Sequence, residues 1–194
     1  MGASLDDSEL DKARGSGMDH SSYEKPWYAI QVKTRFEKVV ALHLRGKAYD
    51  EYLPTYRSRR RWSDRVKEIE RPLFPGYIFC RFDATDRLPL LVIPGVKSIV
   101  GFGGTLMSVP EQEIAALKRV INSGMQYGPW PGISVGQAVQ VRHGPLRGLE
   151  GVVVQVKGKH HLIISVNLLQ RSVSVEIDKE SVTPLGQNHP AVVA

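Results

Sequence analysis

The sequence contains a single cysteine, Cys80, among its 194 residues. One thiol forms no internal disulfide and supplies no CxxC pair for a structural zinc site. Because Cys80 lies in an apolar and aromatic run, we interpret it as a small buried strand residue. An apolar run of roughly 18 residues, the length needed to span a bilayer, is also missing. The N-terminus shows neither a secretory signal nor a myristoylation context, so we expect a cytoplasmic protein that does not bind a membrane.

Catalytic motifs are missing as well. His160 and His161, with Glu150 and Asp178, are not accompanied by an HExxH motif, a DxD pair or a nucleophile elbow. We interpret the two histidines as part of a hairpin turn. The stretch 101–106 resembles a phosphate-binding loop but lacks its final glycine and the Lys-Ser or Lys-Thr that follows it. We therefore predict a protein that is not an enzyme and binds no cofactor and no metal.

Positive charge is present, and it is unevenly distributed. The net charge is +6, divided as −4 over residues 1–24, +8 over 25–125 and +2 over 134–186. A basic folded unit attracts polyanions, of which nucleic acid is the usual one. Charge alone is equally compatible with a solvated basic surface.

Composition divides the chain into successive segments. Residues 1–24 are acidic and almost without apolar side chains, so we predict a disordered tail. The stretch 124–133, with three glycines and two prolines in ten residues, is typical of a linker between two folded units. The predicted organisation is a tail at 1–24, a first domain at 25–124, a linker at 125–133, a second domain at 134–186 and a loose end at 187–194.

The first domain is predicted to be α+β, with helices packed on an antiparallel sheet. Thr34 and Glu37 form a capping-box pattern before the first helix, and Ser108 is the expected cap of the last helix, which ends near Gly124. The expected elements are strands at 27–32, 49–57, 65–71, 77–82 and 96–102 and helices after Thr34, from 85 or 86 to 92, and after Ser108.

The second domain is predicted to be a small all-β barrel. Its β-branched runs are short and are separated by turn residues, and so few short strands close most economically into one barrel. The expected strands are 138–142, 151–157, 162–166, 173–177 and 181–183.

An arginine-rich run occupies the predicted loop between two strands of the first domain. Arginines bind phosphates in a bidentate way, and an interleaved tryptophan offers a surface for base stacking. The alternative is an ordinary solvated charged loop. The candidate nucleic-acid contacts are Arg57, Arg59, Arg60, Arg61, Trp62 and Arg65.

Aromatic residues crowd the first domain around Pro75 and Gly76, a pair suited to the middle of a type II turn. Core packing explains most aromatics next to strands, but so many in one domain also suggest a surface groove for a partner helix. In the second domain, Leu168 and Leu169 fall in a turn, where docking of a partner and packing onto the barrel are both plausible.

The chain resembles the NusG family of transcription elongation factors over residues 26–185. The resemblance rests on Trp27-Tyr28, the arginine-rich hairpin, Leu73-Phe74-Pro75-Gly76-Tyr77, Pro94-Gly95-Val96 and a KOW signature at 139–154. The hairpin and the Leu-Phe-Pro-Gly-Tyr motif look closer to specialised members such as UpxY, LoaP or RfaH than to housekeeping NusG. The implied fold is an NGN domain followed by an SH3-like KOW barrel.

The resemblance implies a monomeric elongation and antitermination factor that suppresses pausing. Its N-terminal domain would bind the clamp helices of the RNA polymerase β′ subunit, touch the β gate loop and so bridge the DNA channel. The hairpin would lie near the non-template strand at the upstream fork. The implied clamp groove is Trp27, Tyr28, Phe74, Tyr77 and Phe79, and the implied gate-loop contact is Asp86, Arg87 and Leu88.

The KOW barrel of the family recruits a small-subunit ribosomal protein or Rho through a turn matched here by Leu168, Leu169 and Arg171. Family members that dock those partners often carry Phe-Gly where this chain has Leu169-Gln170, which weakens the expectation of that coupling. The β-branched barrel strands favour a barrel that does not refold into helices. A KOW-type protein that binds RNA or the ribosome mainly through its barrel is the alternative function.

Overall fold

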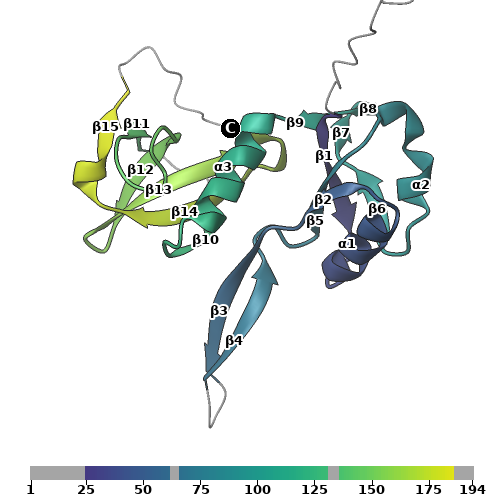
Figure 1. Ribbon diagram of the computed structural model, residues 1–194, viewed down its shortest axis with the longest axis horizontal. Helices are drawn as coiled ribbons and strands as arrows, with labels where there is room; N and C mark the ends of the chain where they lie inside the picture. Colours follow the sequence, from purple (N-terminus) through teal and green to yellow (C-terminus); the bar gives the residue numbers. More distant parts are fainter. Residues whose placement is uncertain (1–24, 62–65, 131–135, 186–194) are drawn as a thin grey trace, which may run out of the picture.

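The computed structural model describes residues 25–61, 66–130 and 136–185. The described chain forms an antiparallel sheet with helices and a strongly curved all-β sheet, as expected for an α+β domain followed by a small barrel (Figure 1). We call these two parts the sheet module and the barrel module. A long two-stranded hairpin projects away from both of them.

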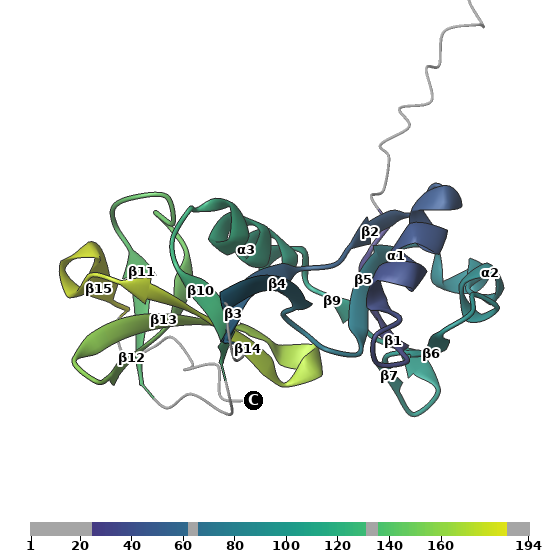
Figure 2. The ribbon, with the colours of Figure 1, turned by 90° about the horizontal axis from the view of Figure 1, so that it is seen from below.

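The sheet module is built around a central strand. The strand order is β2-β5-β1-β6, and β9 also pairs with β1. The helices α1 and α2 lie on one side of this sheet, as both views show (Figure 2). The bounds are β1 Trp27–Val32, α1 Glu37–Gly46, β2 Asp50–Tyr52, β5 Tyr77–Arg81, a 3-10 turn Ala84–Asp86, α2 Leu88–Leu91, β6 Val96–Ile99 and β9 Ser108–Val109.

Strand β1 is buried on both of its faces. Successive side chains on a strand point to opposite sides of the sheet. Tyr28 and Ile30 therefore join the apolar cluster beneath α1 and α2, whereas Trp27 and Ala29 join a second cluster on the other face. Cys80 on the neighbouring strand is fully buried in the first cluster, which confirms its interpretation as a core residue.

The turn between the hairpin and β5 has the predicted type II geometry. Gly76 has φ +84, and the Tyr77 N–H donates to the Phe74 carbonyl at 3.0 Å. The predicted capping box is wrong, because α1 begins at Glu37 without a side-chain cap. The buried Glu37 carboxylate instead accepts a hydrogen bond from the Gly76 N–H at 2.9 Å. A tertiary contact has replaced the local one.

Two hairpins extend from the sheet module. The strand predicted at 49–57 is interrupted at Leu53 and Pro54, since proline cannot donate to a ladder, and this break separates β2 from the long hairpin. The strands of the hairpins are β3 Thr55–Arg61 with β4 Val66–Pro72, and β7 Gly101–Phe102 with β8 Thr105–Leu106.

Helix α3, Glu111–Asn122, lies between the two modules (Figure 1). Its N-cap is Pro110 rather than Ser108, because Ser108 belongs to β9. Its buried residues Ile114, Leu117 and Val120 belong to the same cluster as Trp27 of the sheet module and the apolar interior of the barrel. One continuous apolar cluster therefore runs through both modules.

The barrel module is an antiparallel sheet in the order β10-β14-β13-β12-β11-β15. Part of the stretch predicted as a linker, Tyr127–Trp130, is strand β10, which pairs with β14 and so belongs to this sheet. His160 and His161 lie in β13 rather than in the turn before it. The bounds are β10 Tyr127–Trp130, β11 Gln137–Val141, β12 Glu150–Val156, β13 Lys159–Val166, a 3-10 turn Asn167–Leu169, β14 Arg171–Ile177, a 3-10 turn Lys179–Ser181 and β15 Val182–Pro184. Among the helices in the described ranges, none has the length and apolar character to cross a membrane.

Candidate functional site

Five aromatic residues gather on the face of the sheet that points away from α1 and α2. Ring centroids of Trp27 and Tyr52 lie 6.4 Å apart, those of Tyr52 and Phe79 lie 6.4 Å apart, and those of Phe74 and Phe79 lie 5.8 Å apart. The register pairs Gln31 with Tyr77 and Ala29 with Phe79, which places Tyr77 on the same face. We call this set, which is Trp27, Tyr52, Phe74, Tyr77 and Phe79, the aromatic face.

Tyr28, the remaining residue of the predicted clamp groove, does not share this face. It follows Trp27 on β1, so its side chain points to the opposite side and packs on Phe82 with ring centroids 4.6 Å apart. Tyr52 takes its place in the set. Because neighbouring residues on a strand point to opposite faces, the sequence alone could have excluded Tyr28 from a groove that contains Trp27.

The aromatic face is covered in this arrangement. Trp27, Phe74 and Phe79 are each at most 1% exposed, and Tyr77 is half-buried. The Lys118 ammonium of α3 lies 4.8 Å from the Trp27 ring and 5.3 Å from the Tyr52 ring. The first turn of α3 is tied to the sheet by Glu111, which pairs with Arg81 at 2.6 Å. The predicted groove is therefore filled by this chain itself.

Two polar atoms of the aromatic face are buried without a hydrogen-bond partner among the described residues. They are the Trp27 indole Nε1 and the Tyr52 hydroxyl. Burial also raises the pKa of Tyr52, with a smaller contribution from Tyr127. An unsatisfied buried group costs about 1–3 kcal/mol, so the packing over this face is imperfect.

The barrel turn that carries the predicted partner-docking residues lies against the sheet module. The Arg171 guanidinium is 5.4 Å from the Tyr77 ring centre, and Leu168 and Leu169 are half-buried against the shared apolar cluster. On β10, the Tyr127 hydroxyl donates to the Thr55 carbonyl at 3.0 Å. The two surfaces predicted for separate partners thus face each other.

The basic hairpin is exposed. The side chains of Arg57 and Arg59 are 85% and 80% accessible. Arg60 occupies the register position opposite Lys67, and Arg61 the position opposite Val66. The predicted contacts Trp62 and Arg65 lie outside the described residues.

The base of the hairpin carries the compensating acidic groups. Glu68 pairs with Arg59 at 3.1 Å and lies 3.9 Å from Arg57. Glu70 accepts hydrogen bonds from Lys38 of α1 at 2.6 Å and from Thr55 at 2.8 Å, which hold its pKa below the usual range. From 55 to 72 the sequence has seven basic and three acidic residues, so the hairpin stays positive.

The predicted gate-loop residues Asp86, Arg87 and Leu88 are all exposed, at the junction of a 3-10 turn and α2. Leu88 is 70% exposed and Val92, in the same segment, is 73% exposed. Apolar side chains left in solvent by a short helix are compatible with a contact surface. No group of three or more metal-ligating side chains occurs among the described residues.

A family model described as "Transcription termination factor nusG" matches residues 25–118. A Yersinia pestis protein named "Transcription termination/antitermination protein NusG" is 30% identical over 170 residues, which cover 80% of this chain and 93% of that protein. The chain belongs to the NusG family. A Lactococcus lactis NusG of the same name is 28% identical over 176 residues, covering 83% of this chain and 94% of that one.

The NusG fold is also found among solved structures. The structure titled "Domain interaction in Thermotoga maritima NusG" aligns with a TM-score of 0.52 at 18% identity, covering 84% of this chain and 98% of that one. At this identity the likeness establishes the fold. It confirms the prediction of an α+β module followed by a small β-barrel.

Proposed function

We propose that this chain is a non-catalytic transcription elongation and antitermination factor that binds the RNA polymerase clamp and bridges the DNA channel. The observation that carries the proposal is the similarity to NusG proteins, which spans both modules rather than one. The relatives are named termination/antitermination proteins, and the chain presents an aromatic face and a basic hairpin in the module that the family model matches.

The clamp-binding surface in this proposal is the aromatic face. Its rings offer a large apolar area for two partner helices. The Trp27 Nε1 and the Tyr52 hydroxyl, which have no hydrogen-bond partner within the described ranges, provide polar groups that a partner would satisfy. Because α3 and the barrel cover this face, binding through it requires the modules to separate. The unsatisfied groups lower the cost of that separation.

The barrel docking site in this proposal is the turn with Leu168, Leu169 and Arg171. Since Arg171 lies over Tyr77, a ribosomal protein or Rho at this turn competes with the same intramolecular contact. Partner binding at either surface therefore favours exposure of the other one. This chain has Leu169-Gln170 where family members that dock a ribosomal protein or Rho often carry Phe-Gly. The polymerase is therefore the stronger candidate among these partners.

The hairpin is the proposed contact to the non-template strand. The hairpin projects away from both modules (Figure 1), and the Arg57 and Arg59 side chains beside Glu68 are exposed, so they can reach a phosphate backbone without disturbing the fold. The segment with Asp86, Arg87 and Leu88 is the proposed gate-loop contact. We place the chain among specialised members of the family because of the arginine density of this hairpin.

The clamp proposal is tested with Tyr77→Ala, because Tyr77 is the half-buried edge of the aromatic face. The variant should pull down purified RNA polymerase less efficiently while its circular dichroism spectrum and melting temperature stay close to those of the wild type. Phe102→Ala is the matched control, since Phe102 is 85% exposed in a separate hairpin. Because Tyr77→Ala also removes the contact with Arg171, the loss is measured in an Arg171→Gln background, where that contact is already absent. Full affinity of the well-folded double variant relative to Arg171→Gln alone would exclude the aromatic face as the clamp site.

The hairpin proposal is tested with the double variant Arg57→Gln and Arg59→Gln. Polymerase binding should remain, whereas the protein should lose antitermination in single-round transcription across an intrinsic and a Rho-dependent terminator. Each lost phosphate contact to a single strand should reduce the slope of log affinity against log salt by about 0.7. Arg142→Gln, an exposed barrel arginine, is the control. Unchanged read-through would remove the hairpin from the mechanism.

A further inference from the structure

The hairpin formed by β3 and β4 has two chemically different faces. In an antiparallel pair, directly opposed residues point to the same side of the ribbon, and successive residues point to opposite sides. One face, which we call the arginine face, pairs Arg57 with Glu70 and Arg59 with Glu68 in the register. The other face, which we call the acid-free face, has no acidic residue at any of its register positions. These positions are Tyr56, Ser58, Arg60, Lys67, Ile69 and Arg71.

The arginine face is partly neutralised by its own carboxylates. Arg59 pairs with Glu68 at 3.1 Å, and Arg57 lies 3.9 Å from the same carboxylate group. Glu70 pairs with Lys38 of α1 at 2.6 Å, which ties the base of this face to the sheet module. Opposite charges in directly opposed positions stabilise a two-stranded sheet. The arginine face therefore follows the ordinary rule for a solvated ribbon.

The acid-free face breaks that rule. Arg60 and Lys67 occupy directly opposed positions, and like charges in such a pair are destabilising. Lys67 and Arg71 are exposed, and neither forms an ion pair with a residue in the described ranges. They are four positions apart on β4, which corresponds to about 13 Å. A polyanion on this face would relieve the repulsion that the fold leaves in place.

Two less polar side chains lie beside these cations. Tyr56 is directly opposed to Arg71, and Ile69 lies between Lys67 and Arg71 on the same face of β4. Both are half-buried, so each keeps an accessible part next to an exposed cation. Cations that bind phosphates, next to an aromatic ring that stacks on bases, are the elements of a site for single-stranded nucleic acid. A duplex would leave the ring unused, because its bases are already stacked on one another.

We propose that the acid-free face binds a strand of single-stranded DNA, in addition to the strand at the arginine face. Lys67 and Arg71 contact its phosphates, and Tyr56 and Ile69 pack against its bases. The hairpin then stands between the two unpaired strands of a DNA fork, with one strand on each face. This two-strand arrangement rests on the proposed function, which supplies the strand at the arginine face, whereas binding at the acid-free face does not.

The test uses the full chain and DNA probes labelled for fluorescence anisotropy. One probe is a fork with two oligothymidine arms, and the other is a single oligothymidine strand of the length of one arm. Because the fork joins two strands that engage both faces, we expect it to bind at least about tenfold more tightly than the single strand. Equal affinity for the fork and for either the single strand or a blunt duplex overturns the proposal.

The double variant Lys67→Gln and Arg71→Gln assigns the second contact to its side chains. It should lose the preference for the fork, and the slope of log affinity against log salt should fall by about 1.4, at about 0.7 for each phosphate contact. The exposed pair Arg142→Gln and Lys157→Gln is the matched control, because it removes the same two charges from the barrel. A fork preference that survives in the hairpin variant overturns the proposal.

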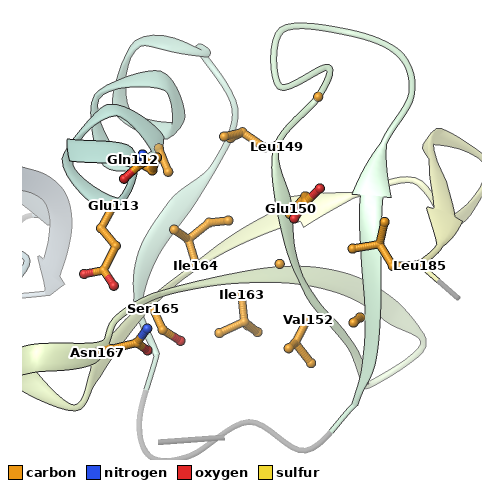
Figure 3. Close-up of a pocket in the computed structure, with 14 residues that line it drawn as sticks. Gln112, Glu113, Leu149, Glu150, Val152, Ile163, Ile164, Ser165, Asn167 and Leu185 are labelled. Carbon is orange, nitrogen blue, oxygen red and sulfur yellow. The ribbon is translucent and has the colours of Figure 1, made fainter. Parts of the chain in front are cut away.

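Isoleucine methyl signals locate the strand by NMR. Ile69 reports on the acid-free face, and its signals should shift saturably with the fork. Ile163 and Ile164 are the reference, because they line a cavity of about 380 Å³ between α3 and the barrel strands β12 and β13 (Figure 3). None of the described residues that line this cavity is a lysine, arginine or histidine, so it offers no positive charge to DNA. Shifts at the reference residues without a shift at Ile69 overturn the assignment.

The same titrations separate this proposal from the proposed function. If Lys67→Gln with Arg71→Gln abolishes DNA binding while Arg57→Gln with Arg59→Gln changes nothing, the acid-free face is the DNA site and the proposed role of the arginine face is wrong. If the two outcomes are reversed, the arginine face keeps its proposed role and the inference of a strand at the acid-free face is overturned.

Discussion

The contact between the two modules includes polar interactions that can be removed while the buried apolar residues of the shared cluster stay unchanged. The double variant Tyr127→Phe and Arg171→Gln removes the hydroxyl that donates to the Thr55 carbonyl at 3.0 Å and the guanidinium that lies 5.4 Å from the Tyr77 ring. Both substitutions keep most of the side-chain volume. Neither residue belongs to the proposed polymerase surface.

The expected loss of docking free energy follows from the two contacts that the variant removes. A hydrogen bond contributes about 1 kcal/mol, and an exposed cation–π pair contributes about 0.5–1 kcal/mol. The loss of about 1.5–2 kcal/mol shifts the docking equilibrium roughly 10-fold to 30-fold toward separated modules. If the docked arrangement dominates in the wild type, polymerase affinity rises by up to the same factor, because the binding-competent fraction rises.

The assay pairs two measurements on the same protein. NMR of the amides at Thr55 and Tyr77 reports whether the interface has opened, and titration with fluorescent polymerase reports affinity. Arg142→Gln should change neither quantity. An opened interface with unchanged polymerase affinity refutes the idea that docking covers the clamp site. An interface that stays closed refutes the assignment of its stability to these two contacts.

Three further predictions concern stability and boundaries. Glu37→Ala should lower the free energy of unfolding in urea by about 1–3 kcal/mol, because the Gly76 N–H loses its acceptor, whereas Glu37→Gln should retain most of it. Cys80 should react with a thiol reagent at pH 8 only as fast as the protein opens, because burial raises the pKa of its thiol to about 12; rapid labelling of the folded protein would contradict this. A barrel fragment that starts at 134 should melt at a lower temperature than one that starts at 124, because it lacks β10 and leaves the edge of β14 unpaired; equal melting temperatures would place the boundary after β10.

Local patterns in the sequence carry much of this fold. The β-branched and aromatic run at 27–32 predicts β1 with the bounds observed, and the Pro75-Gly76 pair predicts a turn with positive φ at the glycine. Short runs of valine and isoleucine locate the barrel strands to within a few residues. These features depend on the conformational propensity of single residues and on the spacing of apolar residues, and both can be read from a single sequence.

Where the structure differs from the prediction, the cause is a contact between segments that are distant in sequence. Glu37 matches a capping box, but the unpaired N–H of Gly76 is a better partner in three dimensions. Strand β10 contains Gly128 and Pro129, so its composition is that of a linker, and only the free edge of β14 makes it a strand. The packing of α3 and the barrel over the aromatic face joins residues far apart in sequence, and no local pattern encodes it.

The apolar cluster that passes from Trp27 through α3 into the barrel makes the two modules one thermodynamic unit. Heat or denaturant should therefore melt them in a single cooperative step, with calorimetric and van't Hoff enthalpies in agreement. Each module then acts on the other as a bound ligand would, so that a substitution which destabilises one of them lowers the stability of both.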